Sequence, residues 1–214
     1  TGNPYGRPAG ERLVWAAGLD VRTCAERPGA EVLFWVGCAG AFDPHARRIA
    51  RATAALLRAA GVDFAVLGAE ERCTGDLARR AGQEALFLTL AEQNRDTLAR
   101  YAAAGGVRRI VTGCPHCLHT LRHEYPDLGV RYPVVHTTEL LAELLAEGRL
   151  VPRRAGPRSV VVHDACYLAR YAGDVTSPRA VLGRVPSSAA RRWLTRSRLR
   201  SSRNGAETVS ATGA

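Results

Sequence analysis

Between positions 31 and 164, the apolar residues alternate between two patterns along the chain. Short runs of β-branched and aromatic residues are followed by longer stretches with apolar residues three or four positions apart. The runs are typical of buried strands and the longer stretches of amphipathic helices, so the alternation predicts an α/β fold with a mostly parallel sheet. We expect strands at Glu31–Val36, Asp63–Leu67, Arg109–Thr112, Pro133–His136 and Ser159–Val162.

The stretches between these strands predict four helices. Three of them end at Gly61, Pro126 and Gly148, residue types that stop helices. Gly82 is expected to bend the second helix. The predicted helices span His45–Ala60, Asp76–Ala103, His116–Tyr125 and Thr138–Glu147, with Asp43 and Asp76 as N-caps.

The two ends of the chain lack this alternation. Residues 1–30 contain three prolines and predict a linker-like segment. Residues 183–214 are rich in Arg, Ser, Ala and Gly and predict a disordered tail. The net charge is +10, and this tail holds seven arginines against one acidic residue, Glu207. We therefore place the folded domain at residues 31–182.

The composition of the 214 residues excludes several classes of protein. A hydrophobic share of 46% and a charged share of 23% are ordinary for a globular protein. No stretch reaches the roughly 18 apolar residues of a membrane span, and the N-terminal residues do not have the layout of a secretion signal. We expect a reducing, cytoplasmic compartment. Because the chain starts at Thr1 and contains no Met, we also expect a fragment of a longer polypeptide.

Five of the six cysteines follow predicted strands. The carboxyl ends of parallel strands meet at one edge of a sheet, where ligands normally bind, so thiols far apart in the sequence are expected to converge there. Cys24 is the exception, and we interpret it as a buried core residue. The candidate ligands are Cys38, Cys73, Cys114 and Cys117 behind the first three strands, with Cys166 behind the fifth.

Four convergent thiolates suit either zinc or an iron–sulfur cluster. Zinc sites more often use two pairs of ligands close in sequence, whereas here only Cys114 and Cys117 form such a pair, which favours a [4Fe–4S] cluster over structural zinc. A third alternative is a thioredoxin-like thiol–disulfide oxidoreductase that uses the same pair, because the motif follows a strand and opens a helix. Two βα units precede it here, which is not typical of that class.

Four segments resemble a known family, the cysteine-rich CCG domains of the heterodisulfide reductase B-subunit family. They are GCAGAFD at 37–43, CTGD at 73–76, GCPHC at 113–117 and HDACYLARY at 163–171. The family pattern is Cys, then Cys-Cys-Gly, then Cys-x-x-Cys, and it usually occurs twice. Here Thr74 replaces the second Cys of the doublet, and the second copy begins at Cys166 but is not completed. An out-of-frame gene end would produce such a departure.

The resemblance implies an iron–sulfur electron-transfer module of a larger oxidoreductase. Members with the full doublet hold a non-cubane cluster on five thiolates, so Thr74 implies an ordinary [4Fe–4S] cube on four. The implied partners are a ferredoxin-type module, a membrane-embedded module and a disulfide, quinone or organic acid, at the inner face of the cell membrane. Because the second motif copy is incomplete, we assign no catalytic residue and expect no substrate conversion by this chain alone.

Other polar residues give weaker signals. His119 and His123 are four positions apart on one predicted helix but lack the acidic partner of a catalytic zinc motif. His163 and Asp164 precede Cys166, where they either contact a bound group or cap a loop. Aromatic residues are not interleaved with a basic stripe in the predicted domain, so we do not expect nucleic-acid binding.

Overall fold

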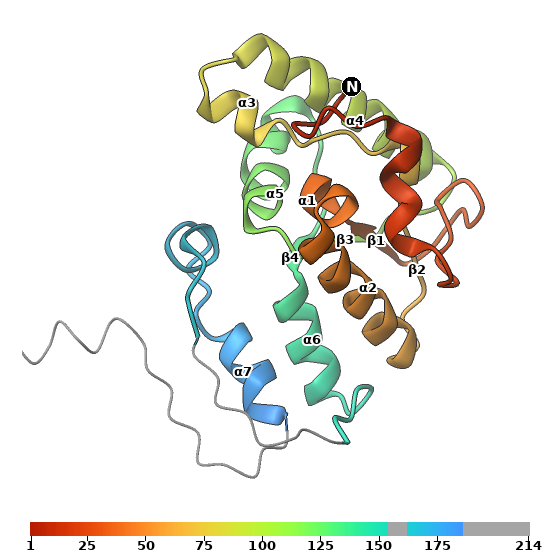
Figure 1. Ribbon diagram of the computed structural model, residues 1–214, viewed down its shortest axis with the longest axis vertical. Helices are drawn as coiled ribbons and strands as arrows, with labels where there is room; N and C mark the ends of the chain where they lie inside the picture. The colour runs from red at the N-terminus through yellow and green to blue at the C-terminus, as the bar shows by residue number, and fades with distance from the viewer. Residues whose placement is uncertain (154–161, 186–214) are drawn as a thin grey trace, which may run out of the picture.

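A four-stranded parallel sheet is the centre of the fold. The computed structural model describes residues 1–153 and 162–185, and within them the strand order is β2-β1-β3-β4 (Figure 1). The strands are β1 (Val32–Trp35), β2 (Phe64–Ala65), β3 (Arg109–Thr112) and β4 (Val134–His136). All three pairings are parallel, which confirms the predicted fold class. Of the predicted fifth strand, residues 159–161 lie outside the described part of the chain.

Helices connect the strands and cover the sheet. The α-helices are α1 (Gly37–Phe42), α2 (Pro44–Ala59), α3 (Asp76–Arg80), α4 (Glu84–Ala103), α5 (Pro115–His119), α6 (Thr137–Ala146) and α7 (Ser177–Arg184). The 3₁₀ helices are η1 (Ala9–Ala16), η2 (Gly68–Glu70) and η4 (Tyr125–Leu128), and π-helical turns are η3 (Thr120–Glu124) and η5 (Tyr167–Tyr171). Among the described residues, no helix is both long and apolar enough to cross a membrane.

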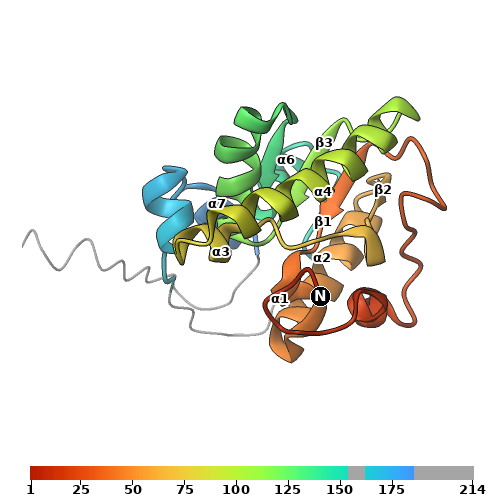
Figure 2. The same cartoon turned by 90° about the horizontal axis from the view of Figure 1, so that it is seen from above.

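The sheet separates two apolar layers. Leu33, Trp35 and Ile110 pack with residues of α4 and α5, whereas Val32 and Phe34 pack with α2, α6 and η1 (Figure 2). Neighbouring residues of β1 therefore belong to opposite layers, as the pleat of a strand requires. Because helices cover both faces of the sheet, every residue of β1 is apolar. This uninterrupted apolar run is the pattern that predicted the strand.

The predicted helices differ from the observed ones near the candidate site. The predicted helix Asp76–Ala103 is two helices, α3 and α4, and Gly82 between them has a φ of +76°. The helix expected over His116–Tyr125 is the short α5 followed by η3 and η4. Asp43 caps α2 as predicted, since its carboxylate accepts the backbone N–H groups of His45 and Ala46.

The first thirty residues, predicted to be linker-like, pack against the sheet domain. Trp15 is 2% exposed and belongs to the apolar layer over α2. Further along, the backbone N–H of Cys24 donates to the carbonyl of Val66 at 2.8 Å. Only one side of the 3₁₀ helix η1 is buried, at Arg12, Trp15 and Ala16, so the segment shows neither strand nor α-helix periodicity. At the other end, α7 extends to Arg184 and residues 186–214 lie outside the described part.

Candidate metal centre

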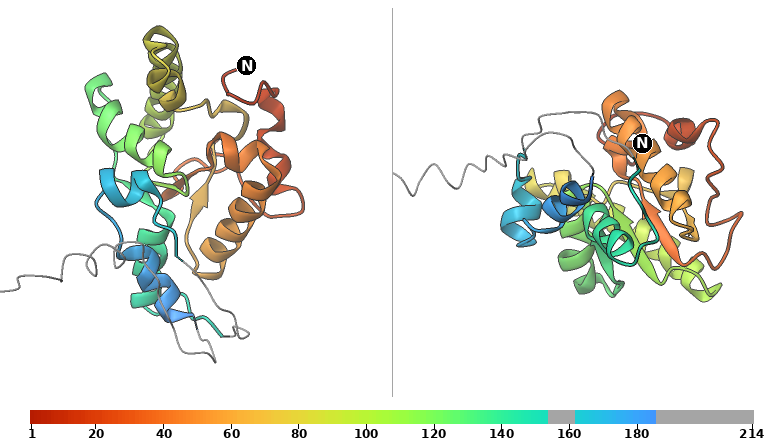
Figure 3. Two further views of the ribbon diagram at one scale, coloured as in Figure 1. Left: turned by 60° about the vertical axis from the view of Figure 1, so that its left-hand side comes forward. Right: turned by 90° about the horizontal axis from the view of Figure 1, so that it is seen from below.

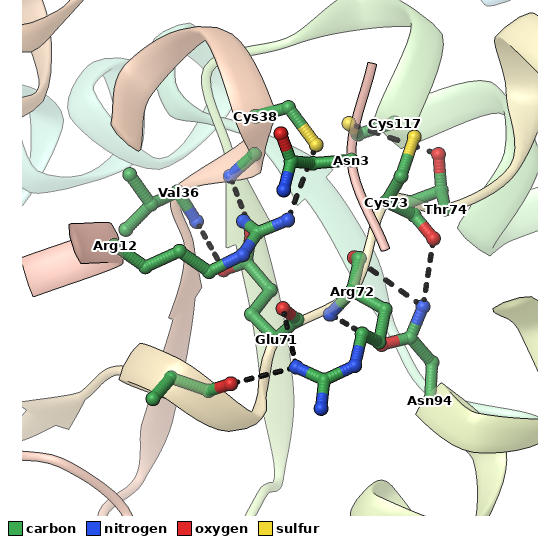
Figure 4. Close-up of polar contacts among 12 residues, drawn as sticks. Asn3, Arg12, Val36, Cys38, Glu71, Arg72, Cys73, Thr74, Asn94 and Cys117 are labelled. Carbon is green, nitrogen blue, oxygen red and sulfur yellow. Dashed lines mark hydrogen bonds and ion pairs between the residues drawn. The ribbon is translucent and has the colours of Figure 1, made fainter. Parts of the chain in front are cut away.

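The four candidate cysteines lie at the carboxyl end of the sheet, on three separate loops. Cys38 lies in the first turn of α1, directly behind β1. Cys73 lies between η2 and α3, behind β2. Cys114 and Cys117 lie at the start of α5, behind β3. Figure 4 shows the sulfur atoms of Cys38, Cys73 and Cys117 gathered in one place.

The four thiols form two interacting pairs. The pKa of Cys38 is raised and the pKa of Cys73 is lowered to about 7, chiefly by the interaction between these two side chains. In the same way, the interaction between Cys117 and Cys114 raises the pKa of Cys117 and lowers the pKa of Cys114 to about 6. Each pair therefore supplies a thiolate close to neutral pH, and the thiolate is the form that binds metal.

The two pairs lie against each other. The hydroxyl of Thr74, directly after Cys73, lies 3.9 Å from the sulfur of Cys117. The pKa of Cys117 is raised by its interaction with Cys114, by burial and by negative charge on Cys114, with a smaller contribution from the Cys73 thiolate of the other pair. Gly37 has a φ of +74°, and a Cβ at this position would lie 3.4 Å from the Cys117 sulfur. A glycine here lets the β1–α1 turn approach α5 closely.

Backbone N–H groups surround two of the sulfurs. The N–H of Gly75 donates to the sulfur of Cys73 at 3.5 Å. At the start of α5, the N–H groups of His116 and Cys117 favour the Cys114 thiolate and contribute to its lowered pKa. The first N–H groups of a helix have no partner within the helix, so they are available to an anion.

A buried asparagine fixes the loop that carries Cys73. Asn94, on the inner face of α4, accepts the N–H of Arg72 at 3.0 Å and donates to the carbonyl of Cys73 at 3.0 Å. Tyr125 extends this network, because its hydroxyl donates to the Thr74 carbonyl at 3.1 Å. Asn94 is fully buried, so these contacts satisfy a polar group that would otherwise be costly to bury. A polar residue in an apolar helix face was the signal in the sequence for this role.

A buried ion pair lies beside Cys38 (Figure 4). One guanidinium nitrogen of Arg12 lies 2.9 Å from the Glu71 carboxylate, and the other donates to the Cys38 sulfur at 3.2 Å. Glu71 also accepts the N–H groups of Val36 and Gly37. Burial raises the pKa of Glu71, and Arg12 and the two N–H groups oppose this rise. Neither Arg12 nor Glu71 was predicted as a site residue, because Arg12 lies in the segment that was expected to be linker-like.

The other two cysteines lie apart from these pairs. Cys24 is buried in the core, as predicted, and burial raises its pKa to about 11. Cys166 is exposed and lies directly before η5. Its neighbour Tyr167 stacks on His116 with ring centroids 3.8 Å apart, so η5 packs beside α5 (Figure 3).

The remaining polar candidates make structural contacts. Asp76 was expected to cap a helix, but its carboxylate instead contacts His116 at 2.8 Å and accepts from Thr120 at 3.3 Å, which joins α3 to α5 and η3. Asp164 forms a two-bond ion pair with Arg179 of α7, with both distances 2.8 Å. The rings of His119 and His123 lie 5.2 Å apart.

The donor set suits an iron–sulfur cluster better than a single ion. Among residues 1–153 and 162–185, no three His, Cys, Asp or Glu side chains are grouped closely enough to hold one metal ion. The four cysteines of the three loops supply the number of thiolates that a cubane cluster binds. The donors are soft sulfurs, which iron–sulfur clusters require.

Comparison with known proteins agrees with this chemistry. Residues 32–122 match the model of the CCG family, described as a cysteine-rich domain. Residues 32–122 are thus similar to the cysteine-rich domains of this family. The match covers the loops of Cys38, Cys73, Cys114 and Cys117 and ends within η3. No solved structure matches the chain significantly.

Three relatives that match most of the chain are described as a ferredoxin and as oxidoreductases. A probable membrane-anchored ferredoxin of Chromohalobacter salexigens is 47% identical over 85% of the chain and 27% of its own length. The probable iron-sulfur-binding oxidoreductase FadF of Bacillus subtilis is 40% identical over 86% of the chain and 27% of its own length. One component of the dihydromethanophenazine:CoB–CoM heterodisulfide reductase of Methanosarcina mazei is 32% identical over 86% of the chain and 44% of its own length. The chain thus spans less than half the length of each.

Proposed function

We propose that this chain is the iron–sulfur electron-transfer module of a heterodisulfide-reductase-like oxidoreductase. In this proposal, Cys38, Cys73, Cys114 and Cys117 hold one [4Fe–4S] cluster, and Cys166 is a further candidate ligand. The observation that carries the proposal is that cysteines from three loops meet at the carboxyl edge of the sheet, where the sulfurs of Cys38, Cys73 and Cys117 lie together (Figure 4). The cluster supplies the one-electron chemistry.

The protein's own part is to hold the ligands and to exclude water. Cys38 and Cys117 are buried, and Cys73 and Cys114 are partly buried. The Gly75, His116 and Cys117 N–H groups favour negative charge on the sulfurs, which stabilises the reduced, more negative state of a bound cluster. The partners we propose are a ferredoxin-type module on one side and a disulfide, quinone or organic acid on the other.

The name of one relative supports a site near a membrane, because the Chromohalobacter protein is described as a probable membrane-anchored ferredoxin. We propose a cytoplasmic position at the inner face of the cell membrane, held there by a membrane-embedded module of the oxidoreductase.

Metal analysis after anaerobic purification tests the proposed cofactor. We expect a brown protein with about four iron and four acid-labile sulfide per chain. A colourless protein with about one zinc would instead establish a structural zinc module, which is the second candidate. A metal-free protein with a reversible Cys114–Cys117 disulfide would establish a thiol–disulfide oxidoreductase. Either of these results would overturn the proposal.

Substitution of the ligands separates a specific site from adventitious iron. We expect Cys73→Ser and Cys114→Ser each to lose most of the iron. The matched control is Cys24→Ala, because Cys24 is a buried cysteine of the same domain whose raised pKa comes from burial and Glu70 rather than from the other thiols. It is expected to keep its full iron content. Equal loss of iron from all three variants would contradict the assignment.

A further inference from the structure

The proposed cluster site does not account for the buried ion pair beside it. The side chains of Arg12 and Glu71 are only 3% and 2% exposed, and the residues are 59 positions apart in the sequence. Burying two charges is unfavourable unless their hydrogen bonds are satisfied. The Glu71 carboxylate accepts hydrogen bonds from Arg12 and from two backbone N–H groups. The guanidinium of Arg12 donates its second hydrogen bond to the sulfur of Cys38.

Arg12 belongs to a segment that lies outside the CCG match at residues 32–122. This segment reaches across the edge of the sheet where the thiols lie. At its start, the carbonyl of Gly2 accepts the N–H of Cys73 at 2.8 Å. At its end, Arg51 of α2 donates to the carbonyls of Trp15 and Ala17. The segment is therefore fixed at both ends, with Arg12 between them.

The position of Arg12 gives it an electrostatic effect on any group bound at Cys38. A positive donor at a thiolate ligand stabilises the more negative, reduced state of an iron–sulfur cluster, which raises its reduction potential. Glu71 opposes this effect, since its negative charge lies against the same guanidinium. The two residues thus act on the cluster with opposite signs.

We propose that Arg12 is a positioning residue that donates to the Cys38 ligand and sets the reduction potential of the cluster. This proposal rests on the proposed function. Glu71 holds the guanidinium in place and offsets part of its charge. The four proposed ligands come from the loops behind β1, β2 and β3, whereas the guanidinium cation beside them comes from the N-terminal segment. The N-terminal segment is therefore part of the electron-transfer site.

Redox titration of the cluster in the full chain tests the proposal. The titration is monitored by the absorbance or the EPR signal of the cluster. Arg12→Gln is expected to shift the potential to a more negative value, and Arg12→Lys, which keeps the charge, to retain most of the wild-type value. Glu71→Gln is expected to shift it to a more positive value. The matched control is Arg7→Gln, because Arg7 is an exposed arginine of the same segment that pairs with Glu11. Its potential is expected to stay unchanged.

The outcomes separate this proposal from the proposed function. If the wild type binds a cluster and Arg12→Gln has the same potential, the role of Arg12 is wrong and the electron-transfer module stands. Equal shifts in Arg7→Gln and Arg12→Gln would also overturn it, since they would reflect net charge alone. If Arg12→Gln does not fold, Glu71→Gln decides by the sign of its shift, because a positive shift supports the proposal and any other result overturns it. A wild type without iron overturns both.

Discussion

The side-chain amide of Asn94 donates a 3.0 Å hydrogen bond to the backbone carbonyl of Cys73. The same side chain donates to the hydroxyl of Tyr125 at 3.0 Å, so one residue of α4 connects the ligand-bearing loop to the packed helix layer. The Cys73 loop has no helix or strand of its own between η2 and α3. Its shape therefore depends on this side chain.

We expect Asn94→Leu to lower the free energy of unfolding by about 2 to 4 kcal/mol, because it leaves partly buried backbone groups of Arg72 and Cys73 without their partner. Iron content is expected to fall with it, since the Cys73 loop loses its anchor. Denaturant titration and iron analysis measure both effects. Gln93→Leu is the control at an exposed neighbour, with a change within about 0.5 kcal/mol. Equal effects of the two substitutions would contradict the assigned role.

Gly75→Ala is expected to be more damaging than Gly82→Ala. Both glycines have positive φ, at +88° and +76°, which costs an alanine about 1 to 2 kcal/mol. At Gly75 a Cβ would also lie 2.7 Å from the Phe87 ring, whereas nothing lies within 4 Å at Gly82. This crowding adds about 1 to 3 kcal/mol. Thermal unfolding of the two variants measures the difference, and equal melting temperatures would show that the turn at Gly75 is not crowded.

The metal-free, reduced protein is expected to show distinct thiol reactivities. Only the thiolate reacts with iodoacetamide, and a lowered pKa means that the thiolate forms at lower pH. The pKa of Cys114 is lowered to about 6, chiefly by its interaction with Cys117, so its alkylation is expected to rise as the pH increases through about 6. Burial raises the pKa of Cys24 to about 11, so this thiol is expected to react only in strong alkali. Mass spectrometry of the peptides measures both midpoints, and a shared midpoint would be contrary to this account.

Thr74→Cys is expected to change the cluster. The Thr74 hydroxyl lies 3.9 Å from the sulfur of Cys117, so a cysteine there places a fifth thiol within the site and restores the doublet of the family pattern. We expect an altered EPR signal and iron count. Thr74→Ser keeps the hydroxyl and is expected to match the wild type. If the two variants cannot be told apart, the fifth thiol does not reach the cluster.

The strands were predictable because a strand that is buried on both faces is a continuous run of apolar residues. Val32 to Trp35 are four consecutive buried residues, and the predicted range contained all of them. The interruption after His119 was not predictable from apolar spacing, because a π-helical turn keeps buried residues at nearly helical intervals. Asp76 likewise looked like a cap by position, while its partners His116 and Thr120 lie 40 and 44 positions away.

The candidate site was predictable as far as its cysteines are concerned. Each cysteine follows a strand, and the rule that carboxyl ends of parallel strands share an edge gave their convergence. The residues that surround the sulfurs were not predictable in this way. Arg12 reaches Cys38 from a segment without periodicity, and its partner Glu71 comes from another loop, so only the folded chain brings them together. Whether Cys38, Cys73, Cys114 and Cys117 are the ligands stays a prediction.

Anomalous diffraction at the iron absorption edge, from crystals of the anaerobically purified protein, tests the ligand assignment most directly. The account predicts four iron atoms between the loops behind β1, β2 and β3, bonded to the sulfurs of Cys38, Cys73, Cys114 and Cys117. A single metal ion at these thiols, or an iron cluster held by other residues, would contradict it.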